Sequence, residues 1–240
     1  MFYYLVFLSN KNYLKSWYVS GFDHEDYTIE DYFNFPEAFK FLDEVIVFSS
    51  IIKKAVEKVA IYNIDHMAQI RFTGKDSIAL LDRTLPANVE SMKIGQCKYT
   101  LLLNEEGGVQ DDLIIMRVSE EEFILVINAG HDLTGKAMDH GHEVEVISDA
   151  DRILKYKKAG EDVLVEDISA DLAKIDVQGP YSYKLISELF GNEVIRNRNN
   201  PDKNMGFFNF NEFDYEGQHY YISRTGYTNR WGWELYVPAT

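Results

Sequence analysis

The chain has 240 residues, 46% of them hydrophobic, so it can bury a core of one large or two small domains. Its formal net charge is −15, with 39 acidic against 24 basic residues, which argues against nucleic acid and anionic membranes as general partners. The single cysteine, Cys97, excludes an internal disulfide and a cysteine metal cluster, and it favours a reducing, cytoplasmic location.

The first segment, residues 1–54, is rich in aromatic and acidic residues. Its apolar run at 2–8 is too short to span a bilayer and follows no basic residue, so we expect a strand there. Helices are expected over 36–41 and 46–58. The acidic cluster at 23–26, which contains one histidine, is typical of a solvated loop, and we expect no metal there.

A second segment, 55–148, mixes strand and helix patterns. Strands are predicted over 60–64 and 69–73. A helix is predicted over 76–83, because its apolar residues form one packing face and Pro86 stops it.

Residues 99–128 predict an antiparallel meander. Three short apolar runs, at 99–103, 113–118 and 123–128, are separated by tight turns. The first turn, 104–108, ends in two glycines that can adopt positive φ.

Two adjacent acids, Asp111 and Asp112, stand at the head of the second apolar run. One interpretation is that they only extend the turn. The other is that one of them is a carboxylate at the mouth of an apolar pocket. Because neighbouring strand residues face opposite sides, one acid should lie on the same side as Ile114 and Met116.

After the meander, we expect a helix over 134–140 and a strand over 143–147. His131, His140 and His142 are close in sequence but lack the i, i+4 spacing of a helical zinc motif. No metal site is therefore expected.

The third and fourth segments are an insertion, 149–170, and a second α+β part, 171–240. The insertion predicts a hairpin that turns at 157–162. The last part predicts a core strand at 172–177 and a helix at 181–190 closed by Gly191. It continues with a polar loop at 197–204 and strands over 207–210, 215–223 and 233–237, with Gly217 in a hairpin turn.

Four sequence motifs carry a resemblance. In chain order they are Asp65-His66-Met67, the stretch NEEGGVQDDLI at 104–114 with VINA at 126–129, VQGP at 177–180, and RTGYT at 224–228. Over about residues 55–240 the chain resembles the glycine cleavage T-protein (aminomethyltransferase) family, whose members carry a closely similar N-x-x-G-G-x-x-D-D-L segment.

The resemblance implies an α+β fold with antiparallel sheets and inserted helices, much of it in β-α-β-β-α-β order. In this family, three domains form a ring around a central folate channel. The chain would supply the first two domains, and the terminal β-barrel would be missing after Thr240.

The resemblance also implies an activity, the transfer of an aminomethyl carbon from a lipoyl-carrier protein to tetrahydrofolate with release of ammonia. Asp112 matches the family aspartate next to the reacting folate nitrogens and is the expected catalytic residue. Glu234 matches the glutamate that binds the pterin edge. The remaining residues expected to line the folate slot are Met67, Tyr99, Ile114, Val126, Asn128, Phe207 and Phe208.

The chain departs from the family pattern at several positions. Phe207, Phe208 and Met116 stand where relatives often carry tyrosines, and Asn229-Arg230-Trp231 replaces a common Gly-Glu-Asp. The insertion at 149–170 is a further departure, which bears on substrate identity.

Two alternatives keep the resemblance but change the activity. Residues 91–97 and the FFNF-x-x-FDYEG stretch look like a folate-dependent demethylase of the dimethylsulfoniopropionate type, which takes a small methylated substrate. The other alternative is a folate-binding regulatory or iron–sulfur assembly protein, although the K-G-C-Y-x-G-Q-E signature of that branch does not occur in this sequence.

Overall fold

The computed structural model describes residues 57–129, 134–139, 142–228 and 230–239. The chain divides into two compact units, 1–50 and 51–240, and all described residues belong to the second. The strand expected at 2–8, the helix at 36–41, most of the helix at 46–58 and the acidic cluster at 23–26 lie outside the described residues.

The predicted meander forms the centre of a five-stranded sheet, here called the meander sheet. Its order is β3-β4-β5-β2-β8, and every neighbouring pair is antiparallel. The strands are β2 (Ala68–Thr73), β3 (Cys97–Leu103), β4 (Val109–Arg117), β5 (Glu122–Ile127) and β8 (Leu164–Asp167). The predicted turn between β3 and β4 is confirmed, with Gly107 at φ 82° and its N–H donating to the Asn104 carbonyl at 3.0 Å.

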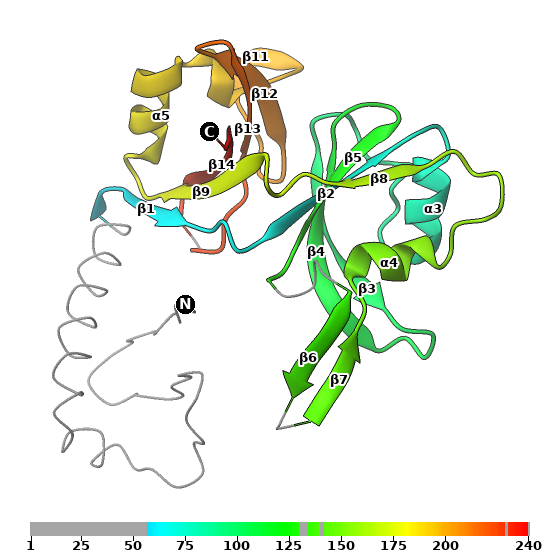
Figure 1. Ribbon diagram of the computed structural model, residues 1–240. Coiled ribbons are helices and arrows are strands. Elements are labelled where there is room, and N and C mark those ends of the chain that lie inside the picture. The colour runs from blue at the N-terminus through cyan, green and yellow to red at the C-terminus, as the bar shows by residue number, and fades with distance from the viewer. Residues whose placement is uncertain (1–56, 130–133, 140–141, 229, 240) are drawn as a thin grey trace, which may run out of the picture. The chain divides into compact units, whose positions relative to one another are not determined.

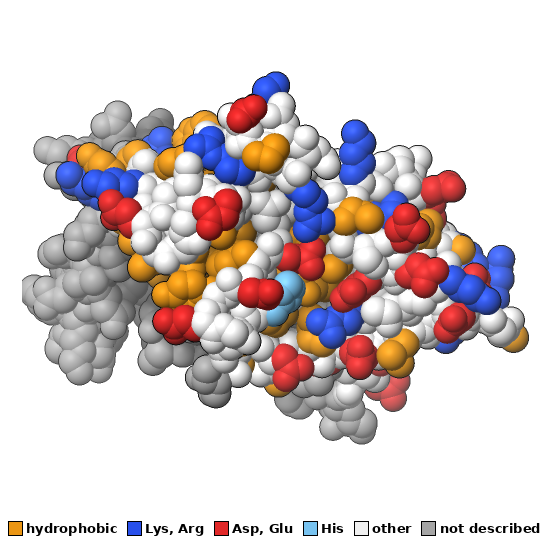
Figure 2. All heavy atoms as spheres, turned by 90° about the horizontal axis from the view of Figure 1, so that it is seen from above, with side chains coloured by type: hydrophobic (Ala, Val, Ile, Leu, Met, Phe, Trp, Pro, Cys, Tyr) orange, Lys and Arg blue, Asp and Glu red, His pale blue; other side chains and the backbone are white. Residues whose placement is uncertain are grey.

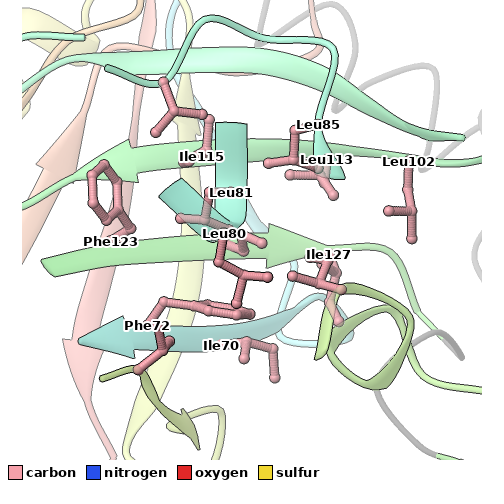
Figure 3. Close-up of a cluster of buried hydrophobic side chains, with 14 of the residues drawn as sticks. Ile70, Phe72, Leu80, Leu81, Leu85, Leu102, Leu113, Ile115, Phe123 and Ile127 are labelled. Carbon is pink, nitrogen blue, oxygen red and sulfur yellow. The ribbon is translucent and has the colours of Figure 1, made fainter. Parts of the chain in front are cut away.

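One face of the meander sheet packs against two helices, α3 (Ser77–Thr84) and α4 (Asp149–Leu154). Leu80 and Leu81 of α3 are fully buried, and Figure 3 shows them beside Phe72, Ile115 and other strand residues. The apolar run of β5 is buried along its length because alternate residues serve the two faces of the sheet.

A second five-stranded antiparallel sheet, here called the split sheet, has the order β1-β9-β14-β13-β12. Its strands are β1 (Ala60–Asn63), β9 (Leu172–Gln178), β12 (Phe210–Tyr215), β13 (Gln218–Ser223) and β14 (Gly232–Pro238). Between β1 and β9 the chain builds the whole meander sheet (Figure 1). The split sheet is therefore interrupted in sequence but continuous in space.

The face of the split sheet that carries Val177 and Trp233 is covered by α5 (Ser182–Phe190) and the short 3₁₀ helix η1 (Glu193–Ile195). Ile186 of α5 is fully buried there, against Val177 and Trp233 among others. Gly191 ends α5 at φ 94°, so the predicted helix and its glycine stop are confirmed.

The two sheets meet at a third apolar cluster. Met116 and Val126 of the meander sheet share it with Phe210 and Tyr236 of the split sheet. Backbone contacts cross at the same place, where the Cys97 N–H donates to the Phe208 carbonyl at 2.8 Å. This junction is where the two sheets present their inner faces to one another.

Four local predictions are wrong. Residues 135–139 are not helical but form strand β6 (Gly135–Asp139), which pairs with β7 (His142–Val146). The insertion begins with helix α4 rather than a strand, because the Ser148 hydroxyl caps it by accepting from the Asp151 N–H at 3.1 Å.

The third wrong prediction is the loop at 197–204, which contains a small hairpin of β10 (Arg196–Asn197) and β11 (Asn200–Asn204). The strand expected to begin at 207 begins only at Phe210, because the preceding residues turn. The turn at Gly217 between β12 and β13 is confirmed. With antiparallel sheets and a few short helices, the α+β class is confirmed as well.

None of the described helices is long and apolar enough to cross a membrane. On the face shown in Figure 2, acidic and basic side chains are interspersed, with hydrophobic patches between them. Among the described residues, no group of three or more His, Cys, Asp or Glu side chains is placed to hold a metal ion.

Candidate functional site

The two adjacent acids lie inside strand β4, so the interpretation that they only extend the turn is wrong. Asp111 is buried on the face of β4 that carries Ile115, which belongs to the cluster beneath α3. Asp112 is half-buried on the face of Ile114, which packs at the junction of the two sheets. The opposite facing expected from strand alternation is therefore confirmed.

Asn128, directly after β5, holds both acids. Its side-chain Nδ2 donates to Asp111 Oδ1 at 2.9 Å, to the Asp112 backbone carbonyl at 2.9 Å and to Asp112 Oδ1 at 3.2 Å. On the other side, the Tyr99 hydroxyl is hydrogen-bonded to the Asp112 carboxylate, and this bond is the largest cause of the raised pKa of Tyr99. We call Tyr99, Asp111, Asp112 and Asn128 the acidic centre.

The apolar site residues gather at the junction of the sheets. Ile114 and Val126 are direct cross-strand partners on β4 and β5. Val126 is fully buried in the junction cluster, and Met67, Ile114 and Phe208 pack against that cluster from its edge. The structure thus brings four of the predicted apolar slot residues together.

The two phenylalanines of the predicted slot behave differently. Phe208 has φ 56°, a value that non-glycine residues rarely adopt, and it is held there by backbone bonds to Cys97 and Arg224. Phe207 is 60% exposed and touches the edge of the Phe208 ring, with centroids 4.7 Å apart. Phe207 therefore stands at the rim rather than inside the apolar cluster.

Glu234 is buried on β14 with a partner on each oxygen. Lys174 Nζ of the neighbouring strand β9 lies 3.2 Å from Oε1, and the Thr225 hydroxyl donates to Oε2. Thr225 in turn shares a 2.6 Å hydrogen bond with the Ser223 hydroxyl. Glu234 is thus an oriented carboxylate inside the protein and not an exposed strand residue.

A second carboxylate, Asp176, is the direct cross-strand partner of Glu234 and is also buried. Burial, followed by the charge of Glu234, raises the pKa of Asp176 to about 7. The Gln178 amide, which donates to Asp176, and the nearby Lys174 ammonium act in the opposite direction. We call Lys174, Asp176 and Glu234 the lysine centre.

The lysine centre reaches the apolar slot through Met67. Lys174 Nζ lies 3.6 Å from Met67 Sδ and 5.4 Å from the centroid of the Tyr236 ring. Met67 itself packs against the junction cluster beside Ile114, on the face of β4 that also carries Asp112. One apolar cluster, at the sheet junction, thus connects Met67, which contacts Lys174, with Ile114, which lies on the Asp112 face of β4.

Residues 224–228 and 230–231, whose role the sequence left open, hold the end of β9 next to the lysine centre. The Thr228 hydroxyl donates to Gln178 Oε1 at 2.7 Å, and the Trp231 carbonyl accepts from the Gly179 N–H at 2.7 Å. Gly226, at φ 127°, lies against the Gln178 amide so closely that a Cβ would collide with it. The Arg224 guanidinium stacks 3.9 Å from the centroid of the Trp231 ring.

The sequence interpretation missed Lys174, Asp176, Gln178 and Thr225. A signal was present, because β9 alternates polar residues at 174, 176 and 178 with apolar residues between them. That period of two predicts one polar face on the strand, yet we expected only a core strand. The polar face is buried here because it lies against the inner side of the sheet junction.

A cavity of about 530 Å³ is lined by a different set of residues. It is lined by Arg83, Asn104, Arg152, Tyr156 and their neighbours, and none of the predicted site residues contributes to it. The candidate site therefore rests on the two polar centres and the apolar surface between them, not on this cavity.

Comparison with known proteins supports the same part of the chain. The family model described as the GCVT N-terminal domain matches residues 31–240, starting ahead of the first motif at Asp65. The chain is 30% identical over 197 residues to the aminomethyltransferase of Exiguobacterium sibiricum, covering 81% of this chain and 48% of that protein. It is 32% identical over 186 residues to the aminomethyltransferase of Cutibacterium acnes, covering 77% and 46%.

Among solved structures, the glycine cleavage system aminomethyltransferase T of Bartonella henselae matches with a TM-score of 0.60 at 27% identity. That match covers 79% of this chain and 44% of the Bartonella protein. The chain spans about half the length of the curated relatives it matches. By sequence, by fold and by the motifs that build its two polar centres, the chain belongs to the family of the glycine cleavage T-protein N-terminal domain.

Proposed function

We propose that this chain carries the folate site of a tetrahydrofolate-dependent aminomethyltransferase, which receives its one-carbon unit from a lipoyl-carrier protein. The observation that carries the proposal is that both polar centres adjoin the apolar cluster at the sheet junction, the lysine centre through Met67 and the acidic centre through Ile114. A reduced folate needs acceptors for the N–H groups of its pterin edge and apolar walls for the flat ring. Its proposed place is a reducing cytoplasm, in keeping with the free, buried thiol of Cys97.

The residues present fit such a ligand. Each ionised carboxylate has about four lone-pair positions, and Glu234 uses one on each oxygen for Lys174 and Thr225. Glu234 thus keeps capacity to accept from the pterin edge. Met67, Ile114, Val126 and Phe208 offer the apolar wall, with Phe207 at its rim.

Tetrahydrofolate, when bound, supplies the nitrogen nucleophile for the transfer. The chain contributes position and charge. Asp112 is proposed to stabilise positive charge that develops beside it, and Asn128 and Tyr99 orient its carboxylate. Glu234 is proposed to fix the ring by its hydrogen bonds.

Calorimetric titration of tetrahydrofolate into the chain tests the folate site. Glu234→Gln keeps the size of the side chain but removes its charge and one acceptor oxygen, so affinity should fall about 10- to 100-fold. Glu188→Gln, on an exposed turn of α5, is the matched control and should bind like the wild type. Equal affinities in all three proteins would remove Glu234 from the site.

The donor is tested separately. A carrier protein loaded with S-aminomethyl-dihydrolipoyl groups should release ammonia when mixed with the chain and tetrahydrofolate. Dimethylsulfoniopropionate, offered instead, should give no methylated folate. The reverse result would replace the aminomethyltransferase proposal by the demethylase alternative.

A further inference from the structure

Lys174 is an unusual residue for the middle of a folded sheet. Its side chain is 1% exposed, on the central part of β9. Burying an ammonium group is costly unless strong acceptors replace its water. The environment of the three N–H donors therefore shows what the residue is adapted to bind.

Among the described residues, the Lys174 ammonium has one oxygen within ion-pair distance, Glu234 Oε1 at 3.2 Å. Its other close contact is Met67 Sδ at 3.6 Å, and a thioether is a weak acceptor. The Tyr236 ring adds a cation–π contact at 5.4 Å. A neutral carbonyl oxygen at the Met67 side would be a much better acceptor than sulfur.

Lys174 Nζ contacts both Met67, which packs against the junction cluster, and Glu234, which is proposed to accept from the pterin N–H groups. In a 2-amino-4-oxo pterin, the ring carbonyl is directly adjacent to the N–H that a carboxylate would accept. A carboxylate and an ammonium group held side by side thus match a donor edge followed by an acceptor.

We propose that Lys174 determines specificity at this site by donating a hydrogen bond to the ring carbonyl of a 2-amino-4-oxo heterocycle whose N–H edge is bound by Glu234. The inference rests on the proposed folate site and names the part of the ligand that Lys174 reads. Lys174 would thereby distinguish an oxo ring from a diamino ring. In a diamino ring an –NH₂ group replaces the carbonyl, so two hydrogen-bond donors would face each other. A site that pairs a buried donor with a substrate acceptor discriminates strongly against analogues that lack the acceptor.

The test compares two ligands that differ at one position, tetrahydrofolate and 4-amino-4-deoxytetrahydrofolate, titrated anaerobically into the full chain. Wild-type protein should prefer the oxo ligand by about 10- to 100-fold, the range for a charged hydrogen bond. Lys174→Met removes the donor at similar length and should abolish this preference, mainly by losing affinity for the oxo ligand. Lys184→Met, an exposed lysine of α5 that is paired with Glu188, should keep the preference.

Because Lys174→Met leaves Glu234 buried beside Asp176, Lys174→Gln serves as a second variant. Its amide can still donate to Glu234 while lacking the charge, so it should fold and show an intermediate preference. If wild type binds both ligands equally, or if Lys174→Gln keeps the full preference, the inference is overturned while the folate site stands. If wild type binds neither ligand, the proposed function fails and the inference fails with it.

Discussion

The acidic centre and the lysine centre each contain two carboxylates, but they hold them in different ways. In the acidic centre, Asp111 and Asp112 share the neutral amide of Asn128. In the lysine centre, the buried Lys174 ammonium pairs directly with Glu234, and its charge also acts to lower the pKa of Asp176. Within the described part of the chain, Asp112 makes no ion pair, so no cation neutralises its carboxylate there.

The difference separates two tasks. A carboxylate oriented by neutral donors retains the field needed to stabilise a positive charge. A carboxylate neutralised by a fixed lysine contributes little net field but presents an ordered set of acceptors and donors. Under the proposed function, the acidic centre would serve the reacting atoms and the lysine centre the recognition of the ring.

The largest effect is expected from unbalancing the lysine centre. Lys174→Met leaves buried carboxylates without their cation, and breaking a buried ion pair in this way costs about 3–5 kcal/mol of unfolding free energy. Urea denaturation measures the loss. Lys184→Met removes an exposed i, i+4 pair with Glu188 and should cost less than about 0.5 kcal/mol. A loss for Lys174→Met as small as for Lys184→Met would show that the buried pair is not a stabilising contact.

The next effect concerns the rate rather than the stability. Asp112→Asn keeps the volume and removes the charge, so single-turnover transfer should fall about 10²- to 10³-fold. Tetrahydrofolate affinity should change much less, because the charge is used mainly in the transition state. Glu106→Gln, in the exposed turn of the same hairpin, should leave the rate unchanged. An unchanged rate for Asp112→Asn would remove the catalytic role of the acidic centre.

Asn128 holds the two acids of the acidic centre, as Lys174 holds Glu234 in the lysine centre. Its removal should lower the unfolding free energy by less than the removal of Lys174. Asn128→Ala removes one side chain that donates to three oxygens of the two acids. Hydrogen bonds to charged groups contribute about 1.5–3 kcal/mol, so thermal or urea unfolding should show a loss in that range. A loss larger than that of Lys174→Met would reverse the ranking of the two centres.

The smallest predicted effect is a pH dependence specific to the lysine centre. The pKa of Asp176 is raised to about 7, above its unfolded value, so its favourable contribution is present at low pH and is lost as pH rises through about 7. Wild-type unfolding free energy should fall by about 1 kcal/mol from pH 6 to pH 7 relative to Asp176→Asn. Urea denaturation of both proteins at the two pH values measures this difference. Parallel pH profiles would show that Asp176 does not titrate in this range.

Much of the fold was predictable because local signals agreed with tertiary packing. The apolar runs of β3, β4 and β5 and the glycine turn at Gly107 are consistent with an antiparallel meander, and α5 stops at Gly191. The site motifs were predictable only through family resemblance. Apolar residues such as Val126 and Ile114 have no pattern that separates a ligand wall from an ordinary core.

The missed elements depended on partners far from the local pattern. Residues 135–139 were expected as helix, but each pairs with a residue of β7, and that pairing outweighs weak helix propensity. The short polar hairpin of β10 and β11 is exposed or half-buried throughout and has no apolar alternation to indicate strands. Lys174 could not be placed from sequence, because its partner Glu234 is 60 positions away and is brought close only by the β9–β14 register.

The strand order of the split sheet has a consequence for how the chain acquires its structure during synthesis. β14 follows the other strands of the split sheet in sequence but lies between β9 and β13. Until it is added, β1–β9 and β12–β13 are two separate ribbons, each with an unpaired edge facing the gap. Pairing β14 with β9 joins strands that are far apart in sequence, and non-local strand pairing of this kind is slow. The lysine centre therefore forms only once β14 has paired with β9, and a chain that stops before Gly232 leaves these two strand edges free to pair with neighbouring chains.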